Sequence, residues 1–275
     1  MEGLTPFTSG ALISSWFYVP AVCEIFTMEF PEHTVVVTGG GSGIGKRMAE
    51  RFASKDASVA IADIQNAATV AEGLDAEAMG METDVTDEES VSEFTDAVLN
   101  RFGTIDVLIN NAAMYEPLLE GRDRSFDEIP VEEWRSVLDV NVTGVFICCQ
   151  RMVPHMAEQG SGSVINIASA VMYNGVTGYP HYVTSKGAIP PLTRAIANEV
   201  GEDGVRVNAV APGLVTSEAS QQLGEEYLDT IADYQVLPRN GTPDDVIDTI
   251  EFLASDQSSF ITASTLHPDG GISYR

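Results

Sequence analysis

The chain has 275 residues, of which 41 are Asp or Glu and 14 are Lys or Arg, so its formal net charge is −27. A surface this negative repels phosphate backbones and anionic lipid headgroups, which argues against nucleic acid and membrane partners. Hydrophobic residues make up 44% of the chain. This is enough apolar material for a packed core, and it argues against an intrinsically disordered chain.

Lysine is depleted within this small basic complement, since only Lys46, Lys55 and Lys186 occur beside eleven arginines. An ordinary acidic cytosolic protein and a protein adapted to high salt would both carry such a charge. The lysine depletion favours a halophilic source, because a Debye length of ~3 Å at 1 M salt screens the self-repulsion. The three cysteines, Cys23, Cys148 and Cys149, form no disulfide framework and no metal-ligand spacing. They fit a reducing, cytoplasmic location, and no metal is expected.

The first 27 residues have a different character from the rest. An apolar run covers 11–19, but no Lys or Arg precedes Lys46, so a positively charged signal-peptide start is missing. The run is also shorter than the ~20 apolar residues of a membrane span. We expect residues 1–27 to be a non-core extension, disordered or artefactual, and residues 28–275 to form the folded domain.

Beyond this segment, short β-branched runs alternate with longer amphipathic stretches. The runs predict strands at 34–38, 58–62, 79–83, 105–110, 163–168, 205–210 and 264–267. The amphipathic stretches predict helices at 43–54, 66–76, 87–102, 131–158, 180–201 and 243–255. This alternation predicts an α/β fold, a single doubly wound Rossmann-type domain with a parallel sheet of about seven strands and helices on both faces. Irregular stretches at 114–130 and 213–242 follow strand carboxyl ends, where such sheets bind ligands.

The first predicted strand runs into a glycine-rich turn, Thr38-Gly39-Gly40-Gly41-Ser42-Gly43-Ile44-Gly45, and a helix follows. Glycines let the backbone approach a pyrophosphate, and the helix N-terminus supplies N–H groups and positive potential. Asp63 ends the second strand, where a carboxylate accepts hydrogen bonds from the ribose hydroxyls of NAD and repels the extra phosphate of NADP. NAD is therefore expected, and NADP is less favoured; Lys46 and Arg47 just past the turn are the residues that could reverse this preference.

Further motifs follow in a fixed order. They are Asp84-Val85, Asn110-Asn111-Ala112-Ala113, Asn141 in Asn-Val-Thr-Gly, Ser169 in Asn-Ile-Ala-Ser, Tyr182-Val-Thr-Ser-Lys186, and Pro212-Gly213 with Val215 and Thr216. Over residues 34–272 this set resembles the short-chain dehydrogenase/reductase family. The resemblance implies a catalytic set of Asn141, Ser169, Tyr182 and Lys186. It implies cofactor contacts from Thr38, Gly39, Ser42, Gly43, Ile44, Gly45, Asp63, Asp84, Val85, Asn111, Ala112, Tyr182, Lys186, Pro212, Gly213, Val215 and Thr216.

The chemistry of the catalytic set agrees with this resemblance. Tyr182 and Lys186 are spaced i, i+4 and share one helical face. An unperturbed tyrosine has a pKa of ~10, and a nearby ammonium is expected to lower it toward the working pH. Ser169 can hydrogen-bond the reacting oxygen. Taken singly, Tyr182 could be a half-buried helix residue, Lys186 a surface charge and Ser169 a helix cap.

The resemblance implies an NAD(H)-dependent oxidoreductase that interconverts a secondary alcohol and a ketone by hydride transfer, with Tyr182 as general acid/base. It also implies that Lys186 holds the nicotinamide ribose and that Asn141 positions a water linking Lys186 to solvent. A glucose-type sugar dehydrogenase and a 3-oxoacyl-thioester reductase share these motifs. A non-catalytic NAD sensor is the alternative of another class, although it would need only the glycine-rich turn and Asp63.

The expected substrate pocket is built from 170–179, 114–130 and 213–242, with an apolar to mixed lining of Met172, Tyr173, Tyr179 and His181. Five acidic residues of the stretch 213–242 disfavour an anionic substrate. They are Glu218, Glu225, Glu226, Asp229 and Asp233. Three positions depart from the family pattern: Ala113, Ala263 and the pair Pro190-Pro191. The prolines are expected to kink their helix, which in the family packs between subunits of a tetramer or dimer.

Overall fold

Seven parallel strands form the centre of the molecule in a computed structural model that describes residues 28–115, 124–216, 220 and 224–274. The sheet order is β3-β2-β1-β4-β5-β6-β7, and every neighbouring pair is parallel. The strands are β1 Thr34–Thr38, β2 Ser58–Asp63, β3 Ala78–Glu82, β4 Val107–Asn110, β5 Gly162–Ile167, β6 Val205–Val210 and β7 Thr265–Leu266. The predicted fold class is confirmed. The predicted extension, residues 1–27, lies outside the described residues.

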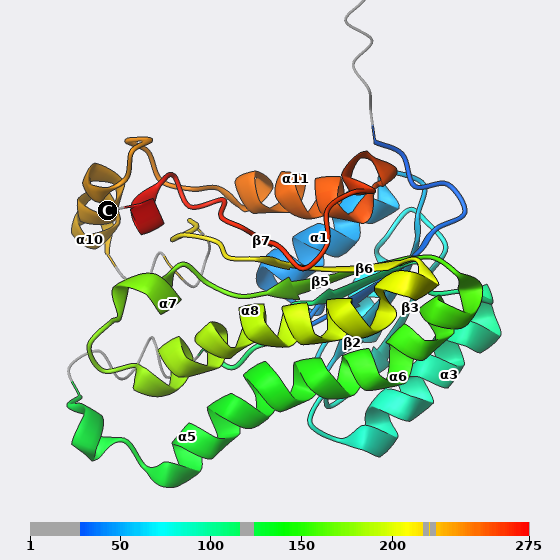
Figure 1. Cartoon of the computed structure of the whole chain (residues 1–275), viewed down its shortest axis with the longest axis horizontal. Coiled ribbons are helices and arrows are strands. Elements are labelled where there is room, and N and C mark those ends of the chain that lie inside the picture. Colours follow the sequence, from blue (N-terminus) through cyan, green and yellow to red (C-terminus); the bar gives the residue numbers. More distant parts are fainter. Residues whose placement is uncertain (1–27, 116–123, 217–219, 221–223, 275) are drawn as a thin grey trace, which may run out of the picture.

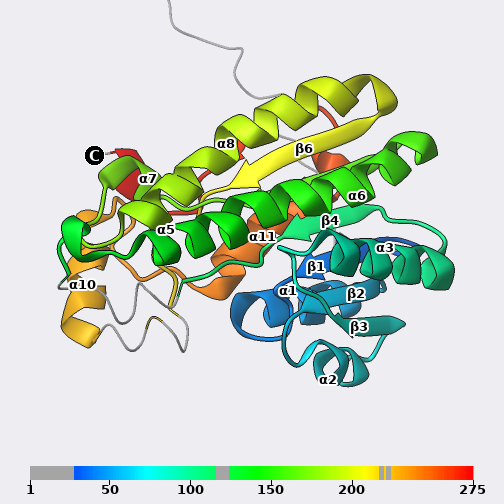
Figure 2. The ribbon, with the colours of Figure 1, turned by 90° about the horizontal axis from the view of Figure 1, so that it is seen from below.

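Helices cover both faces of this sheet (Figure 1). Their bounds are α1 Gly43–Ala53, α2 Ala67–Glu72, α3 Glu88–Phe102, α5 Val131–Leu138, α6 Gly144–Gln159, α7 Val171–Asn174, α8 Pro180–Val200, α10 Glu225–Tyr234 and α11 Pro243–Ala254. Helices α1 and α11 lie on one face. Helices α3, α6 and α8 lie on the other, as the view from below shows (Figure 2).

The two-sided packing follows from the side-chain alternation along each strand. In β1, Val35 and Val37 pack in the cluster that contains Phe52 of α1, whereas Val36 packs in the cluster that contains Phe94 of α3. All five side chains are fully buried. Burying one large apolar side chain contributes about 1.5–3 kcal/mol, so the central strands of this sheet hold the two helical layers in place.

Cys148 and Cys149 of α6 are buried free thiols, as the sequence pattern predicted. Burial raises the pKa of Cys149 to about 12 and raises that of Cys148 further. Both thiols therefore stay protonated and act as small core residues rather than as nucleophiles.

The strand order reverses between β1 and β4, because the chain winds from β1 toward β3 and then returns to β4 on the other side. At such a point the connections leave the two strands in opposite directions, and the carboxyl ends of the strands border an open crevice. The turn after Thr38 and the motif that begins at Asn110 both lie at this crevice.

Two elements differ from the predicted pattern. The stretch 213–242 contains α10, whose Leu228, Ile231 and Ala232 have the i, i+3, i+4 spacing of an amphipathic helix. The predicted helix 131–158 is divided by a π-helical turn at Asp139–Thr143. Helix α8 matches the predicted helix 180–201 and contains both prolines, with Pro190 buried; the kink expected at these prolines stays a prediction.

The helical run Val131–Gln159 is the one stretch in the described part of the chain that is long and apolar enough to cross a membrane. Half of its most apolar window is buried inside the protein. Its C-terminal part, α6, supplies Met152 and Met156 to the core beneath the sheet. The run therefore has the packing of a core helix.

Candidate active site

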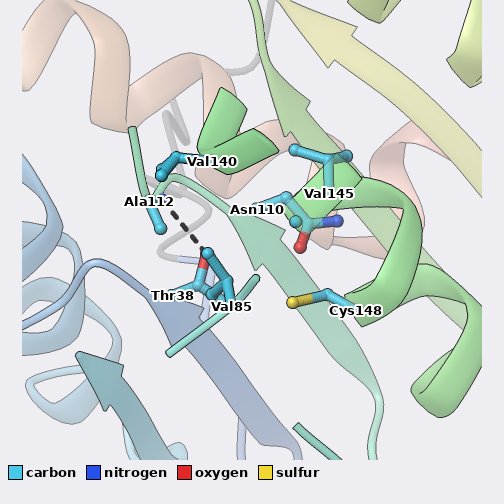
Figure 3. A pocket seen from close by; sticks show the side chains of 8 residues that line it. Thr38, Val85, Asn110, Ala112, Val140, Val145 and Cys148 are labelled. Carbon is cyan, nitrogen blue, oxygen red and sulfur yellow. Dashed lines mark hydrogen bonds between the residues drawn. The ribbon is translucent and has the colours of Figure 1, made fainter. Parts of the chain in front are cut away.

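Hydrogen bonds connect the turn after β1 to the residues that follow β4. The Asn111 side-chain amide donates to the carbonyls of Thr38 and Gly39, both at 3.0 Å. The Thr38 hydroxyl accepts the backbone N–H groups of Asn111 at 3.0 Å and of Ala112 at 3.1 Å (Figure 3). Gly39 has φ +65°, and a Cβ there would lie 2.7 Å from the Ala112 Cα, so only glycine fits.

The N-terminus of α1 opens into free space. Its N-cap, Ser42, has extended backbone, and its side chain makes no capping hydrogen bond. No acidic side chain occupies the first turn, and a Cβ on Gly43 would have no heavy atom within 4 Å. The first N–H groups of a helix lack backbone partners and carry positive potential. Ser42 to Gly45 therefore fit the pyrophosphate of a dinucleotide.

Gly45 is expected to tolerate no side chain, because a Cβ would lie 2.1 Å from the Gly39 carbonyl oxygen and 2.5 Å from the Asn111 amide nitrogen. Gly45→Ala should lower the free energy of unfolding by about 1–3 kcal/mol and weaken NAD binding, because the turn must shift. Gly201→Ala is the matched control, since its Cβ meets nothing within 4 Å and its φ is −64°. It should change stability by less than about 1 kcal/mol. Urea unfolding measures both, and equal effects would contradict the close approach.

Asp63 at the end of β2 faces the same turn. Its two carboxylate oxygens accept the backbone N–H groups of Gly41 at 2.8 Å and of Gln65 at 2.9 Å. Each oxygen keeps a further lone pair for a ribose hydroxyl. In the part of the chain that the structure describes, no Lys or Arg forms an ion pair with Asp63. The carboxylate is thus oriented and its negative charge is not neutralised.

A small pocket lies at the crevice, between the ends of β1 and β4 and the start of α6 (Figure 3). It is lined by Thr38, Val85, Asn110, Ala112, Val140, Gly144, Val145 and Cys148. Most of this lining is apolar. The Asn110 Oδ1 is buried without a hydrogen-bond partner within the described ranges, although its amide nitrogen donates to Asn166 at 2.8 Å.

The pair Asp84-Val85 borders this pocket. The Asp84 carboxylate accepts the Thr86 N–H at 2.9 Å and the Thr86 hydroxyl at 2.7 Å, which fixes the loop after β3. Asp84 is exposed, and Val85 is buried against Gly144. Asp84 therefore faces solvent and Val85 lines the pocket, and their predicted contact with the cofactor stays a prediction.

Tyr182, Lys186 and Ser169 come together at the carboxyl ends of β5 and β4. The Ser169 side chain lies close enough to the Tyr182 side chain to oppose the rise of its pKa. The Lys186 Nζ donates to the Ile167 carbonyl at 2.8 Å and lies 5.9 Å from the centroid of the Tyr182 ring. Lys186 is almost fully buried and Tyr182 is half-buried. The three residues of the predicted catalytic set are thus neighbours.

The predicted direction of the Tyr182 pKa is wrong for the protein without cofactor. Burial raises the pKa of Tyr182 to about 12, and the Ser169 side chain opposes only part of this rise. Burial also lowers the pKa of Lys186 to about 8. Removing the phenolate from water costs more than its stabilisation by nearby groups. Tyr182 therefore holds its proton at neutral pH and is ready to donate it.

Asn141 is fully buried in the π-helical turn, an element that often marks functional sites. Its Oδ1 accepts the Met114 N–H at 2.7 Å, and its amide donates to the Ser185 hydroxyl at 3.0 Å. Ser185 in turn donates to the Tyr182 carbonyl at 2.8 Å. Asn141 is therefore connected to the backbone of Tyr182, and a water between Asn141 and Lys186 stays a prediction.

The loop after β6 closes the other side of the site. Gly213 donates its N–H to the Pro268 carbonyl at 3.2 Å, and Thr216 donates to Gly241 at 2.8 Å. Val215 forms an isolated parallel bridge with Gly241. These bonds hold Pro212–Thr216 beside the carboxyl end of the sheet, where the sequence predicted the cofactor contacts.

The structure describes only some of the residues that were predicted to line the substrate pocket. Tyr173 is exposed on α7 and its hydroxyl lies 2.9 Å from the His267 Nε2. His181 is fully buried, so the prediction that it lines the substrate pocket is wrong. Asp229 is exposed. Residues 116–123, Glu218 and the side chains of Glu225 and Glu226 lie outside what the structure describes.

One functional feature was missed from the sequence. His181 contacts Glu133 of α5 at 2.9 Å, and Glu133 pairs with Arg124. No spacing signal joins these three residues, because 48 positions separate Glu133 from His181. The only clue in the sequence was that His181 directly precedes Tyr182.

The fold and this site define a dinucleotide-binding oxidoreductase. A family described as enoyl-(acyl carrier protein) reductase matches residues 39–273. The chain is 37% identical over 246 residues to cis-4-hydroxycyclohexanecarboxylate dehydrogenase of Sinomonas cyclohexanicum, covering 88% of this chain and 97% of the relative. It is 36% identical to a 3-oxoacyl-(acyl-carrier-protein) reductase of Thermotoga maritima, over 86% and 96% of the two chains.

Two solved structures have the same fold. Levodione reductase superimposes with a TM-score of 0.81 at 31% identity, covering 90% of this chain and 99% of its own. A short-chain type dehydrogenase/reductase from Mycobacterium ulcerans gives a TM-score of 0.84 at 30% identity, over 90% and 92%. The chain belongs to the short-chain dehydrogenase/reductase family and is an NAD(P)-dependent oxidoreductase of alcohols and carbonyls.

Proposed function

We propose that the protein interconverts a secondary alcohol and a ketone with NAD(H), and that Tyr182 is the general acid/base. The observation that carries this proposal is the grouping of three residues: Ser169 lies close enough to Tyr182 to oppose the rise of its pKa, and the Lys186 ammonium lies 5.9 Å from the centroid of the tyrosine ring. The group lies at the same sheet edge as the glycine-rich turn. A hydroxyl or carbonyl placed between Ser169 and Tyr182 would meet both a donor and an acid at one oxygen.

Each residue has a distinct part in this mechanism. In reduction, Tyr182 donates its phenolic proton to the carbonyl oxygen, while Ser169 holds that oxygen by a hydrogen bond. Bound nicotinamide would supply the hydride in reduction and accept it in oxidation. Lys186, fixed by the Ile167 carbonyl, stabilises the phenolate that forms and is placed to hold the nicotinamide ribose. In oxidation, Tyr182 takes the hydroxyl proton.

NAD is the proposed cofactor in preference to NADP. Asp63 presents two oriented oxygens to the position of a ribose, and the described ranges offer no ion-pair partner that would neutralise it. The Asp63 carboxylate would repel the 2′-phosphate of NADP, whereas it would accept hydrogen bonds from the two ribose hydroxyls of NAD. Lys46 of α1 is exposed and pairs with Glu50 at 3.8 Å, one turn further along the helix.

A secondary alcohol or ketone that is uncharged at the reacting end is the proposed substrate class. The exposed carboxylate of Asp229 on α10 disfavours an anionic substrate group near the stretch 213–242. The runner-up is a 3-oxoacyl-thioester reductase, because one relative carries that activity in its name. A panel of alcohols, sugars, ketones and 3-oxoacyl thioesters, assayed with NAD(H) and NADP(H) in molar salt, decides between them. Turnover of none would contradict the proposal.

We propose a halophilic source from the net charge of −27 with only three lysines, and a cytoplasmic location from cysteines that form no disulfide framework. Carboxylates crowd on one helix, where Asp244, Asp248 and Glu251 of α11 all contact Arg51. The melting temperature is expected to rise by several degrees between ~0.1 M and ~2 M KCl, because salt screens the self-repulsion. Sucrose at equal osmolality controls for general exclusion of co-solutes. A melting temperature unchanged by KCl would contradict halophilic adaptation.

A homo-oligomer, tetramer or dimer, is also proposed. Large apolar side chains stay exposed on the described surface, including Phe146 of α6 and Phe260 after α11, which is fully exposed. Apolar groups of this size usually mark a contact with another molecule when they gather in one patch. Light scattering of the purified protein in molar salt gives the subunit number.

A further inference from the structure

The N-terminus of α8, which carries Tyr182, lacks the usual side-chain cap. Its N-cap residue, Tyr179, makes no capping hydrogen bond, and Pro180 at the first helical position has no N–H to offer. The helical ladder begins when the Val183 N–H donates to the Tyr179 carbonyl at 3.0 Å. The Tyr182 N–H therefore precedes the ladder and needs a partner from elsewhere.

His181 provides that partner. The Tyr182 N–H donates to the His181 Nδ1 at 2.9 Å, so Nδ1 carries no proton. The other ring nitrogen, Nε2, lies 2.9 Å from the Glu133 Oε1. A carboxylate only accepts, so Nε2 carries the proton and donates it. The imidazole is fully buried, and its two hydrogen bonds fix both its tautomer and its orientation.

Glu133 is itself held from the opposite side. Arg124 binds it with two parallel hydrogen bonds, Nη1 to Oε2 at 2.9 Å and Nη2 to Oε1 at 2.5 Å. The Arg124 guanidinium, and to a smaller extent His181, hold the pKa of Glu133 below its ordinary value. A bidentate guanidinium–carboxylate pair is among the more rigid and directional contacts in proteins. Glu133 therefore stays charged and oriented toward His181.

The chain of contacts thus runs from Arg124 through Glu133 and His181 to the backbone of Tyr182. The peptide on the other side of Tyr182 is fixed as well, because Ser185 donates to its carbonyl and Asn141 donates to Ser185. Arg124 lies within the stretch 114–130, and Asn141 binds Met114 at the start of it. Two residues of the expected substrate loop, Met114 and Arg124, are therefore connected to Tyr182 through these contacts.

We propose that His181 is a positioning residue for Tyr182, and that Glu133 and Arg124 hold it in the productive tautomer. The inference rests on the proposed function, because Tyr182 must be the acid/base for its position to matter. Ångström-size misplacement of a reacting group costs up to about 100-fold in rate. Loss of the His181 bond should therefore lower kcat more than it changes KM or NAD affinity.

Two substitutions separate the two hydrogen bonds of His181. In His181→Asn the side-chain oxygen takes the place of Nδ1 and still accepts the Tyr182 N–H, but the side chain is too short to reach Glu133. In His181→Gln the amide nitrogen takes the place of Nε2 and reaches Glu133, but no acceptor remains for Tyr182. We expect His181→Gln to lower kcat about 10- to 100-fold. Asparagine has no tautomer for Glu133 to hold, so we expect His181→Asn to stay within about threefold of wild type despite losing that contact, with KM changed less than about threefold in both variants.

Glu133→Gln is the second variant, in case a substitution at the buried histidine prevents folding. It removes one of the two oxygens that Arg124 binds, and it should lower kcat about tenfold with little change in KM. Glu132→Gln on the same helix is its matched control, because the Glu132 side chain is 82% exposed whereas that of Glu133 is 22% exposed. Glu132→Gln should leave kcat unchanged.

The readouts are kcat, KM, NAD affinity and the melting temperature, with wild type and Tyr182→Phe measured beside the variants. Full kcat in His181→Gln, an equal loss in His181→Asn and His181→Gln, or an unchanged kcat in Glu133→Gln would overturn the inference. These results differ from failure of the proposed function, in which wild type itself turns over none of the panel or Tyr182→Phe stays active.

Discussion

Tyr182→Phe is expected to lower kcat by about 10²- to 10⁴-fold, the usual contribution of a general acid or base. The substitution removes one hydroxyl and keeps the ring, so the packing of α8 is preserved. NAD affinity should change by less than about threefold, because the phenolic proton is needed only when the substrate reacts. Stopped-flow or steady-state absorbance of the reduced nicotinamide measures the rate, and fluorescence titration measures the affinity.

The reason for so large an effect is the environment of the phenol. Burial raises the pKa of Tyr182 to about 12, so the group holds its proton at neutral pH and can donate it to a carbonyl oxygen. Phenylalanine offers no proton, and Ser169 cannot replace an acid. A non-catalytic NAD sensor would bind cofactor equally well in both forms and would turn over no substrate. A Tyr182→Phe variant with wild-type kcat would show that another group transfers the proton.

Asp63→Asn is expected to change cofactor selectivity by about 10²- to 10³-fold in the ratio of kcat/KM for NAD to that for NADP. The amide keeps an oxygen for one of the two backbone N–H groups of Gly41 and Gln65 but loses the charge. Hydrogen bonds to a charged group contribute about 1.5–3 kcal/mol, so NAD should bind more weakly. The substitution also removes the repulsion of the 2′-phosphate, so NADP should bind more tightly.

Asp56→Asn is the control for this charge change. Asp56 is exposed just before β2, at the opposite end of the strand from Asp63, and its φ of 64° is one that asparagine also adopts. The control should leave the NAD to NADP ratio within about twofold of wild type, because the charge is distant from the turn. If Asp63→Asn and wild type had equal ratios, the preference for NAD would have another origin, with Lys46 and Arg47 the first residues to test.

The strands and the order of the motifs could be predicted from the sequence because their signals are local. β1, β2 and β6 are apolar runs bounded by turn residues, and β1 begins and ends at the predicted residues. Helix α10 also carried a local signal, the spacing of Leu228, Ile231 and Ala232, which was missed within a stretch expected to be irregular. The π-helical turn around Asn141 had no such signal, because its residues fit an ordinary helix equally well.

The proximity of Ser169, Tyr182 and Lys186 could also be predicted, since these residue types at this spacing are unusual; their catalytic role stays a prediction. The pKa shifts of these residues could not be predicted from the sequence. A lysine four residues after a tyrosine predicts a lowered tyrosine pKa, whereas the folded chain buries both groups and shifts the pKa of Tyr182 upward. Desolvation depends on every atom packed around a group, and the sequence names only the group itself.

The sequence by itself determined the parallel α/β sheet, the glycine-rich turn, the acid at Asp63 and the residues predicted to form the catalytic set. Each depends on hydrophobic period or on residue types a few positions apart, which act through local geometry. Only the tertiary structure decided what holds Tyr182 in place. Glu133 and His181 are distant in the chain, and they meet because α5 packs beside α8, while Arg124 binds Glu133 from the segment that precedes α5. Contacts of this kind come from the packing of whole elements, which no short pattern of residues encodes.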